Sequence, residues 1–230
     1  MARGTKDYGG VIDKPEIAIR PLAIYGSGSM LFYDDFESPS IKWGKSTGGN
    51  SEIGLTTTFP SAGDLCMYLK AGGAGLRSCD AQRQLGASPS GRIGLQCSWR
   101  IGEGLWNKWY IQAWVYTGTI LKSFGAGYGP YDKKFCYIAS GGTVTELSSV
   151  TQVPYDTLYN WHTLKVVYDL SEDKYLYLIT DGQTFDISTL EGRSSASSQK
   201  FYYNVRIFSL SLDDSEPMLY IDDVVVTQEP

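Results

Sequence analysis

Acidic side chains gather near both ends of this sequence. Asp34-Asp35 and Glu37 stand near the start, and Asp222-Asp223 stands near the finish. Two carboxylates held a few ångströms apart could act as general acid and base in glycoside hydrolysis. Adjacent residues of a strand point to opposite faces, so neither aspartate pair can converge on one bond. We therefore expect no hydrolytic site and no enzymatic activity.

Nucleophilic and metal-dependent catalysis have little support in the sequence. The chain has one histidine, His162, so paired histidine ligands for a catalytic metal are excluded. A Ser-His-Asp site needs a placed nucleophile. The serines of Gly26-Ser27-Gly28-Ser29 follow a proline-interrupted segment and open no helix, unlike a nucleophile elbow. We expect a structural role for His162.

A second set of candidates is aromatic and amide-bearing. Alternate positions of a strand share one face. One face of the segment 109–116 would fill the core, and the other carries Tyr110, Gln112, Trp114 and Tyr116. Neighbouring strands are expected to add Arg100 and Arg206, with Gln96, Ser98 and Lys165. Rings beside amides and guanidinium groups suit a sugar, a protein partner or burial under another segment, and these three alternatives stay open.

Short strands must carry these residues. Apolar and polar residues alternate over 92–101, 109–116, 163–168 and 203–208, which is the pattern of half-buried strands. Asp181-Gly182 lies between two such runs and predicts a tight hairpin, because both residues tolerate positive φ. The sequence carries 17 Tyr and 26 Gly and shows no long helical period, so it predicts an all-β sandwich or barrel.

The two ends of the sequence and one internal stretch resemble a known family. Leu31-Phe32-Tyr33-Asp34-Asp35-Phe36-Glu37-Ser38 with Trp43, and Met218 to Val226, are similar to the opening and closing strands of concanavalin-like and laminin G-like sandwiches. The stretch from Asn160-Trp161 to Asp181-Gly182 resembles them too. The resemblance covers residues 31–228 and is nearest to non-catalytic carbohydrate-binding modules. It implies an antiparallel jelly-roll β-sandwich over 31–230, preceded by an extended N-terminal arm, 1–30.

The same resemblance implies a structural calcium ion between the end strands. Its ligands would be Asp35, Glu37, Asp222 and Asp223, since calcium prefers carboxylate and carbonyl oxygens. The alternative is that these acids cap strand ends or face solvent. Asp223 alternates in phase with Ile221 and Val225, so it is the acid expected to point inward. The chain departs from jelly-roll glucanases, because it lacks their Glu-x-Asp-x-x-Glu strand.

Charge, hydropathy and cysteine spacing exclude several classes. The net charge is −5 without a Lys/Arg cluster, so we expect no nucleic-acid partner. No apolar run is long enough to span a bilayer, and Met1 to Asp7 lacks the start of a secretory signal. We therefore expect synthesis in the cytoplasm and no membrane association. The cysteines, 66, 79, 97 and 136, form no C-x-x-C motif, and free thiols are favoured over a Cys66–Cys79 disulfide.

The N-terminal arm is the main basis of the functional prediction. Short apolar stretches between residues 11 and 24 are interrupted by Pro15 and Pro21, which predicts an extended segment. We expect this segment to contact neighbouring subunits, with packing on its own sandwich as the alternative. We therefore predict a non-enzymatic assembly protein, such as a capsid decoration or tail component of a phage or virus particle, in a homo-oligomer or shell. The alternative is a lectin-like glycan-binding module, and a glycoside hydrolase ranks last.

Overall fold

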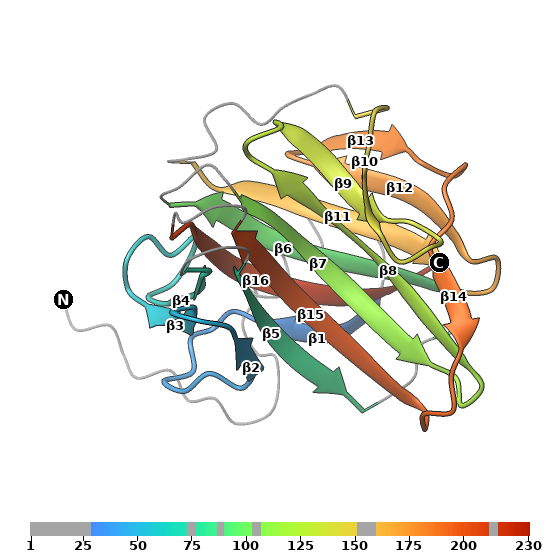
Figure 1. Cartoon of the computed structure of the whole chain (residues 1–230), viewed down its shortest axis with the longest axis horizontal. Helices are drawn as coiled ribbons and strands as arrows, with labels where there is room; N and C mark the ends of the chain where they lie inside the picture. Colours follow the sequence, from blue (N-terminus) through green and yellow to red (C-terminus); the bar gives the residue numbers. More distant parts are fainter. Residues whose placement is uncertain (1–28, 73–76, 87–89, 103–106, 151–159, 212–215) are drawn as a thin grey trace.

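The computed structural model describes residues 29–72, 77–86, 90–102, 107–150, 160–211 and 216–230. Throughout that part of the chain the only regular elements are strands, which form two stacked antiparallel sheets (Figure 1). The β6 sheet runs in the order β13 (Gln183–Asp186), β12 (Lys174–Thr180), β11 (His162–Asp169), β6 (Arg92–Ile101), β16 (Met218–Glu229), β4 (Cys66–Lys70), β3 (Glu52–Thr56), with β1 (Ser29–Asp34) also on β16. The predicted all-β sandwich is confirmed.

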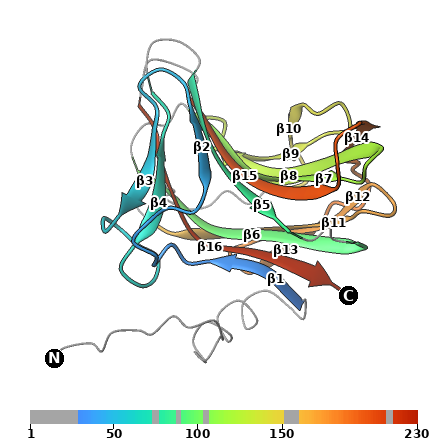
Figure 2. The ribbon, with the colours of Figure 1, turned by 90° about the horizontal axis from the view of Figure 1, so that it is seen from below.

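The second layer, the β7 sheet, is built in the same way. It runs in the order β10 (Val144–Glu146), β9 (Lys134–Ile138), β8 (Ile120–Gly129), β7 (Asn107–Tyr116), β15 (Tyr202–Ser211), β5 (Arg77–Leu85), β2 (Gly44–Thr47), with β14 (Arg193–Ala196) also on β8. In Figure 2 the ribbons of β15, β7 and β8 curve, with the concave side of the ribbons on the outer side of the sheet.

The core lies between the facing sides of β6 and β7, as the alternating patterns predict. Leu95, Trp99, Trp109 and Ile111 have no exposed surface. The rings of Trp99 and Trp109 lie 4.9 Å apart at a tilt of 47°, so the two sheets meet through aromatic packing. Full burial of side chains of this size supplies most of the hydrophobic stabilisation of the sandwich.

The first and last strands lie side by side, as the resemblance implies. In the antiparallel pairing of β1 with β16, Phe32 is opposite Val226 and Asp34 is opposite Val224. Phe36 and Trp43 enter the core directly after β1. The strand begins at Ser29, slightly before the expected boundary at residue 31. The predicted arm otherwise falls on residues 1–28, outside the described part of the chain.

The predicted Asp-Gly turn joins β12 to β13. Asp181 and Gly182 adopt φ of 47° and 80°, and Thr180 pairs with Gln183. The Asp181 carboxylate also reaches His162 Nδ1 at 2.7 Å. The histidine ring is buried and lies 5.0 Å from that of Trp99. The lone histidine therefore joins the hairpin to the core.

All four cysteines are free and buried. Cys66 lies on β4 and Cys79 on β5, which belong to different sheets, so the alternative Cys66–Cys79 hairpin disulfide is wrong. The prediction of free thiols is confirmed. Across the described residues, no helix has the length and apolar character to cross a membrane.

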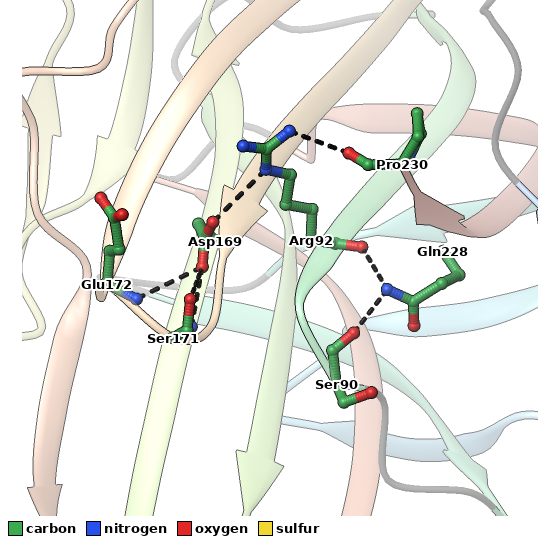
Figure 3. A network of polar contacts seen from close by, with 7 residues as sticks. All are labelled: Ser90, Arg92, Asp169, Ser171, Glu172, Gln228 and Pro230. Atoms are coloured by element: carbon green, nitrogen blue, oxygen red, sulfur yellow. Dashed lines mark hydrogen bonds and ion pairs between the residues drawn. The ribbon is translucent and has the colours of Figure 1, made fainter.

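A polar network fastens the sandwich at the end where the chain finishes (Figure 3). Asp169 Oδ1, at the end of β11, accepts hydrogen bonds from the backbone nitrogens of Ser171 at 2.8 Å and Glu172 at 3.3 Å. The Ser171 hydroxyl also bonds this carboxylate. This bond has the largest effect, and together with the two backbone bonds it lowers the pKa of Asp169. Arg92 contacts Asp169 and donates from Nη1 to the carbonyl of Pro230 at 2.9 Å, which joins β6, β11 and β16.

Candidate functional site

The predicted aromatic residues lie together on the outer side of the β7 sheet. The register of β7 and β15 places Tyr110, Gln112, Trp114 and Tyr116 opposite Phe208, Arg206, Asn204 and Tyr202. We call these eight residues the aromatic face. Its β7 half faces outward because the intervening residues of β7 fill the core.

Ring contacts cross between the two strands along the whole aromatic face. The rings of Tyr110 and Phe208 stack at 4.9 Å and 21°. At the other end, those of Tyr116 and Tyr202 stack at 4.2 Å and 25°. Between them, the guanidinium of Arg206 lies 4.0 Å from the centroid of the half-buried Trp114 ring. Each aromatic side chain is thus fixed by a partner on the neighbouring strand.

The Arg206 guanidinium is held in place by a carboxylate from β5. Arg206 Nε lies 3.2 and 3.1 Å from the two oxygens of Asp80, and Nη2 also bonds Asp80. Gln82 Nε2 donates to Asp80 at 2.6 Å, and Asn204 Nδ2 donates to Gln82 at 3.1 Å. Asp80 is 5% exposed, so removing Arg206 would leave a buried charge without its partner. This network orients the ring-and-guanidinium pair at the centre of the face.

Polar atoms of the aromatic face remain suited to hydrogen bonds. Burial raises the pKa of Tyr110 to about 12, and burial with the bond to Tyr116 raises that of Tyr202 to about 12. Both phenols therefore keep their protons at neutral pH, and that of Tyr202 already donates to Gln199 Oε1 at 2.8 Å. The Asn204 Oδ1 atom is buried and accepts no hydrogen bond within the described structure. A buried acceptor of this kind is costly unless a ligand or water donates to it.

Arg206 lies on the predicted face, but Arg100 does not. Arg100, Gln96 and Ser98 are on β6, and Lys165 is on β11, so they belong to the other sheet. The predicted adjacency is wrong because the chain crosses between the two sheets after β6. Alternating polarity shows which residues share one face of a strand, but it does not show to which sheet the strand belongs. Arg100 instead lies 3.9 Å from the ring centroid of Phe59.

The four predicted calcium ligands lie on β16 at its bulge and just after β1, on separate contacts. Glu37 Oε1 accepts from the backbone nitrogens of Asp64 at 2.7 Å and Leu65 at 3.1 Å. Asp222 Oδ2 accepts from those of Ser61 at 3.0 Å and Ala62 at 3.3 Å. Asp35 Oδ1 accepts from the backbone nitrogen of Glu37 at 3.3 Å, and Asp223 Oδ1 accepts from the Tyr33 hydroxyl at 2.9 Å.

The buried acid of the last strand is Asp222, and the expectation for Asp223 is wrong. Asp222 has no exposed surface, whereas Asp223 is partly exposed. A β-bulge between Asp222 and Val225, with φ of 49° at Asp223, shifts the alternation by one residue. Bulges are not visible in a pattern of apolar residues, so the phase rule fails here.

The carboxylate oxygens of these residues are of the kind that calcium prefers as ligands. The calcium site itself stays a prediction. Asp222 and Glu37 both direct carboxylate oxygens at the segment 61–65, and a hard cation prefers such ligands. Within the described residues, no three His, Cys, Asp or Glu side chains gather, so backbone carbonyls would have to complete the site. Burial and the neighbouring Asp223 raise the pKa of Asp222 to about 8, a shift that a bound cation would reverse.

We expect the stability of calcium-free protein to fall as pH rises from about 4 to 8. In this window unfolded Asp222 is ionised while the folded group holds its proton, so raising pH favours unfolding, by at most about 1.4 kcal/mol per pH unit. Calcium should restore the loss at pH 8. Urea unfolding at pH 5 and 8, with chelator or calcium, measures both effects. Asp222→Asn should abolish them, and an unchanged pH slope in that variant would contradict the assignment.

Comparisons with known proteins bear on the fold. No protein-family model matches the sequence, and a search of curated proteins found no match. Among solved structures, an endo-β-1,4-glucuronan lyase from the fungus Trichoderma reesei is similar with a TM-score of 0.59 at 9% identity, over 87% of this chain and 96% of that one. A carbohydrate esterase from Shiga toxin-encoding bacteriophage phi24B is similar with a TM-score of 0.55 at 17% identity, over 89% and 100%.

At these identities the likeness concerns architecture alone. Both structures are matched along nearly their whole length, so the comparison covers the complete sandwich. Together with the two antiparallel sheets and the adjacent end strands, it confirms the fold that the sequence resemblance implies. The described part of this chain is a concanavalin-like jelly-roll β-sandwich.

Proposed function

We propose that this chain is a glycan-binding module whose ligand lies on the aromatic face. One observation carries the proposal: aromatic and guanidinium groups are paired in register along β7 and β15 on the outer side of the sheet. Rings pack against the apolar faces of sugars, and convergent polar groups fix their hydroxyls. The two similar structures are a glucuronan lyase and a carbohydrate esterase, which supports the same ligand class.

The dimensions of the aromatic face suit several sugar units. Tyr110 and Tyr116 are six positions apart on β7, so the ring pairs at the two ends are separated by roughly 20 Å at about 3.4 Å per residue. A monosaccharide would contact only one of these pairs. The ligand we propose is therefore an oligosaccharide or a polysaccharide chain.

The chemistry of the face favours binding over catalysis. Asp80, the carboxylate beside Trp114 and Arg206, is already bonded to Arg206 and Gln82. The phenols of Tyr110 and Tyr202, with pKa values near 12, are poor bases at neutral pH. A general acid and base need accessible groups with pKa values near the working pH. We therefore propose a non-enzymatic module.

A glycan array tests the proposal directly. The whole chain should bind glycans of several units and ignore monosaccharides, and titration calorimetry on the strongest array ligand should confirm the affinity. Quenching of tryptophan fluorescence by that ligand would follow from contact with Trp114. Absence of binding across the array would contradict the proposal.

We also propose an assembly role for residues 1–30 in a phage or virus particle, as the sequence predicts. The support is the apolar character of that segment and the place of its last residues, which enter β1 beside β16. Removing residues 1–28 spares β1 and should convert an oligomer to monomer in light scattering. An unchanged molar mass would contradict this role, while the glycan proposal would stand.

A further inference from the structure

We propose a second glycan site on the outer side of the β6 sheet, in a cleft lined by Tyr68 and Tyr220, together with the ring of Phe59 that contacts Tyr220. It uses none of the residues of the aromatic face and lies on the opposite layer of the sandwich. The inference concerns the same ligand class as the proposed function but rests on separate observations. These are a row of side chains in register, an exposed ring held in a strained backbone, and a cleft beside them.

The base of the site is a row that crosses four strands. The register places Gly54 of β3 opposite Tyr68 of β4, Tyr68 opposite Tyr220 of β16, and Tyr220 opposite Arg100 of β6. All four positions face the outer side, since Leu69 and Ile221, which alternate with the tyrosines, are in the core. Two tyrosines thus lie next to each other on this outer side, with Tyr220 buried and Tyr68 partly exposed.

Glycines let both tyrosine rings lie against the neighbouring backbone. A Cβ on Gly54 would stand 2.6 Å from Cε1 of Tyr68, and one on Gly102 would stand 2.6 Å from Cε2 of Tyr220. Each ring therefore occupies the space that a side chain would fill. This arrangement turns the rings along the sheet, which leaves Tyr68 partly exposed as a flat surface.

Phe59 extends this surface with a ring that faces water. The residue has φ of 62°, a conformation that is rare for a bulky side chain, and it is 48% exposed as a whole. The Arg100 guanidinium lies 3.9 Å from the ring centroid, and Tyr220 contacts it edge-on at 5.8 Å. Trp161 Nε1 donates to the Phe59 carbonyl at 3.0 Å. Strain maintained by surrounding contacts is a feature of ligand clamps.

A cleft of about 440 Å³, a volume within the usual range for small-ligand sites, has in its wall Tyr220, the residue whose ring contacts Phe59. Its walls are Glu52, Leu55, Thr56, Thr58, Tyr68, Lys70, Met218 and Tyr220. The Tyr68 hydroxyl donates to Glu52, and this bond and burial raise the pKa of Tyr68 to about 12. The cleft therefore combines aromatic surface with carboxylate and hydroxyl oxygens that accept and donate hydrogen bonds.

The charges of the cleft favour a neutral sugar chain. Lys70 pairs with Glu216, and Glu52 adds a carboxylate that would repel an anionic glycan. Two sites on opposite layers would let one module bind two chains, or one chain twice, and so raise its avidity.

Affinity electrophoresis in gels containing neutral β-glucan, xylan or galactomannan tests the second site. Phe59→Gly removes the ring and suits the positive φ, so the fold should be kept. The Trp114→Ala variant, in which the cleft is unchanged, should still be retarded in at least one of these gels. Adding Phe59→Gly should then reduce the affinity at least tenfold, whereas Phe201→Ala, which removes an exposed phenylalanine elsewhere, should have no effect.

Each outcome separates the second site from the aromatic face. Complete loss of retardation by Trp114→Ala alone would overturn the second site and leave the proposed function intact. Loss caused by Phe59→Gly alone, with none from Trp114→Ala, would support the second site and overturn the aromatic face. No retardation of the parent protein, or retention of a protein partner in place of glycans, would overturn both.

Discussion

Replacing Trp114 with alanine is expected to weaken glycan binding at least about 30-fold, because a central aromatic contact is typically worth 2 kcal/mol or more. The ring lies midway along the aromatic face, between the Tyr110–Phe208 and Tyr116–Tyr202 pairs. It also supports the Arg206 guanidinium at 4.0 Å. The substitution therefore removes a stacking surface and loosens a hydrogen-bond donor together. Titration calorimetry with an array-selected glycan measures the loss.

The control keeps the ring at that position. Trp114→Tyr should retain binding within a few-fold, since a smaller ring can still stack. Thermal unfolding of both variants should remain near that of the parent, because Trp114 is half-buried on the outer side of the sheet. Unchanged glycan affinity in Trp114→Ala would contradict a glycan site on the aromatic face.

Asp80→Ala is expected to destabilise the protein by about 2–4 kcal/mol, because it leaves the Arg206 charge partly buried without a partner. The carboxyl side chain is 7% exposed and that of Arg206 is 15% exposed, so solvent screens the pair only weakly. Glycan affinity should fall about tenfold as well. The reason is that Arg206 loses the contact that holds it over Trp114. Urea unfolding and calorimetry measure the two effects.

A double variant separates charge burial from ligand recognition. Asp80→Ala with Arg206→Met removes both charges, so much of the lost stability should return. Glycan affinity should stay low, because the guanidinium is absent. A double variant as unstable as Asp80→Ala, or one that binds like the parent, would contradict the role given to this pair.

Most of the fold could be predicted because the central strands each have one apolar face. The alternation in 92–101, 109–116 and 203–208 matches β6, β7 and β15, whose inward residues form the core. The strand β5 was missed because buried Cys79, Asp80 and Ala81 follow one another without alternating polarity. Asp80 and its bond to Arg206 therefore could not be predicted from the sequence.

The site was predicted in part, for reasons that lie in strand pairing. Tyr110, Gln112, Trp114 and Tyr116 share a face by alternation alone, and the structure adds their β15 partners through the register. Arg100 was assigned to the wrong surface because local patterns do not reveal the crossing from β6 to the other sheet. Phe59 gave no signal, since its exposure and left-handed backbone depend on contacts with Arg100 and Trp161.

The central claim is that glycans bind the outer side of the β7 sheet. Titration of isotope-labelled whole chain with an array-selected oligosaccharide, followed by amide chemical shifts, tests it most directly. We expect the largest chemical-shift changes on β7 and β15, around Trp114 and Arg206, and smaller changes around Phe59 and Tyr68. Shifts confined to other surfaces, or none at saturating oligosaccharide, would contradict it.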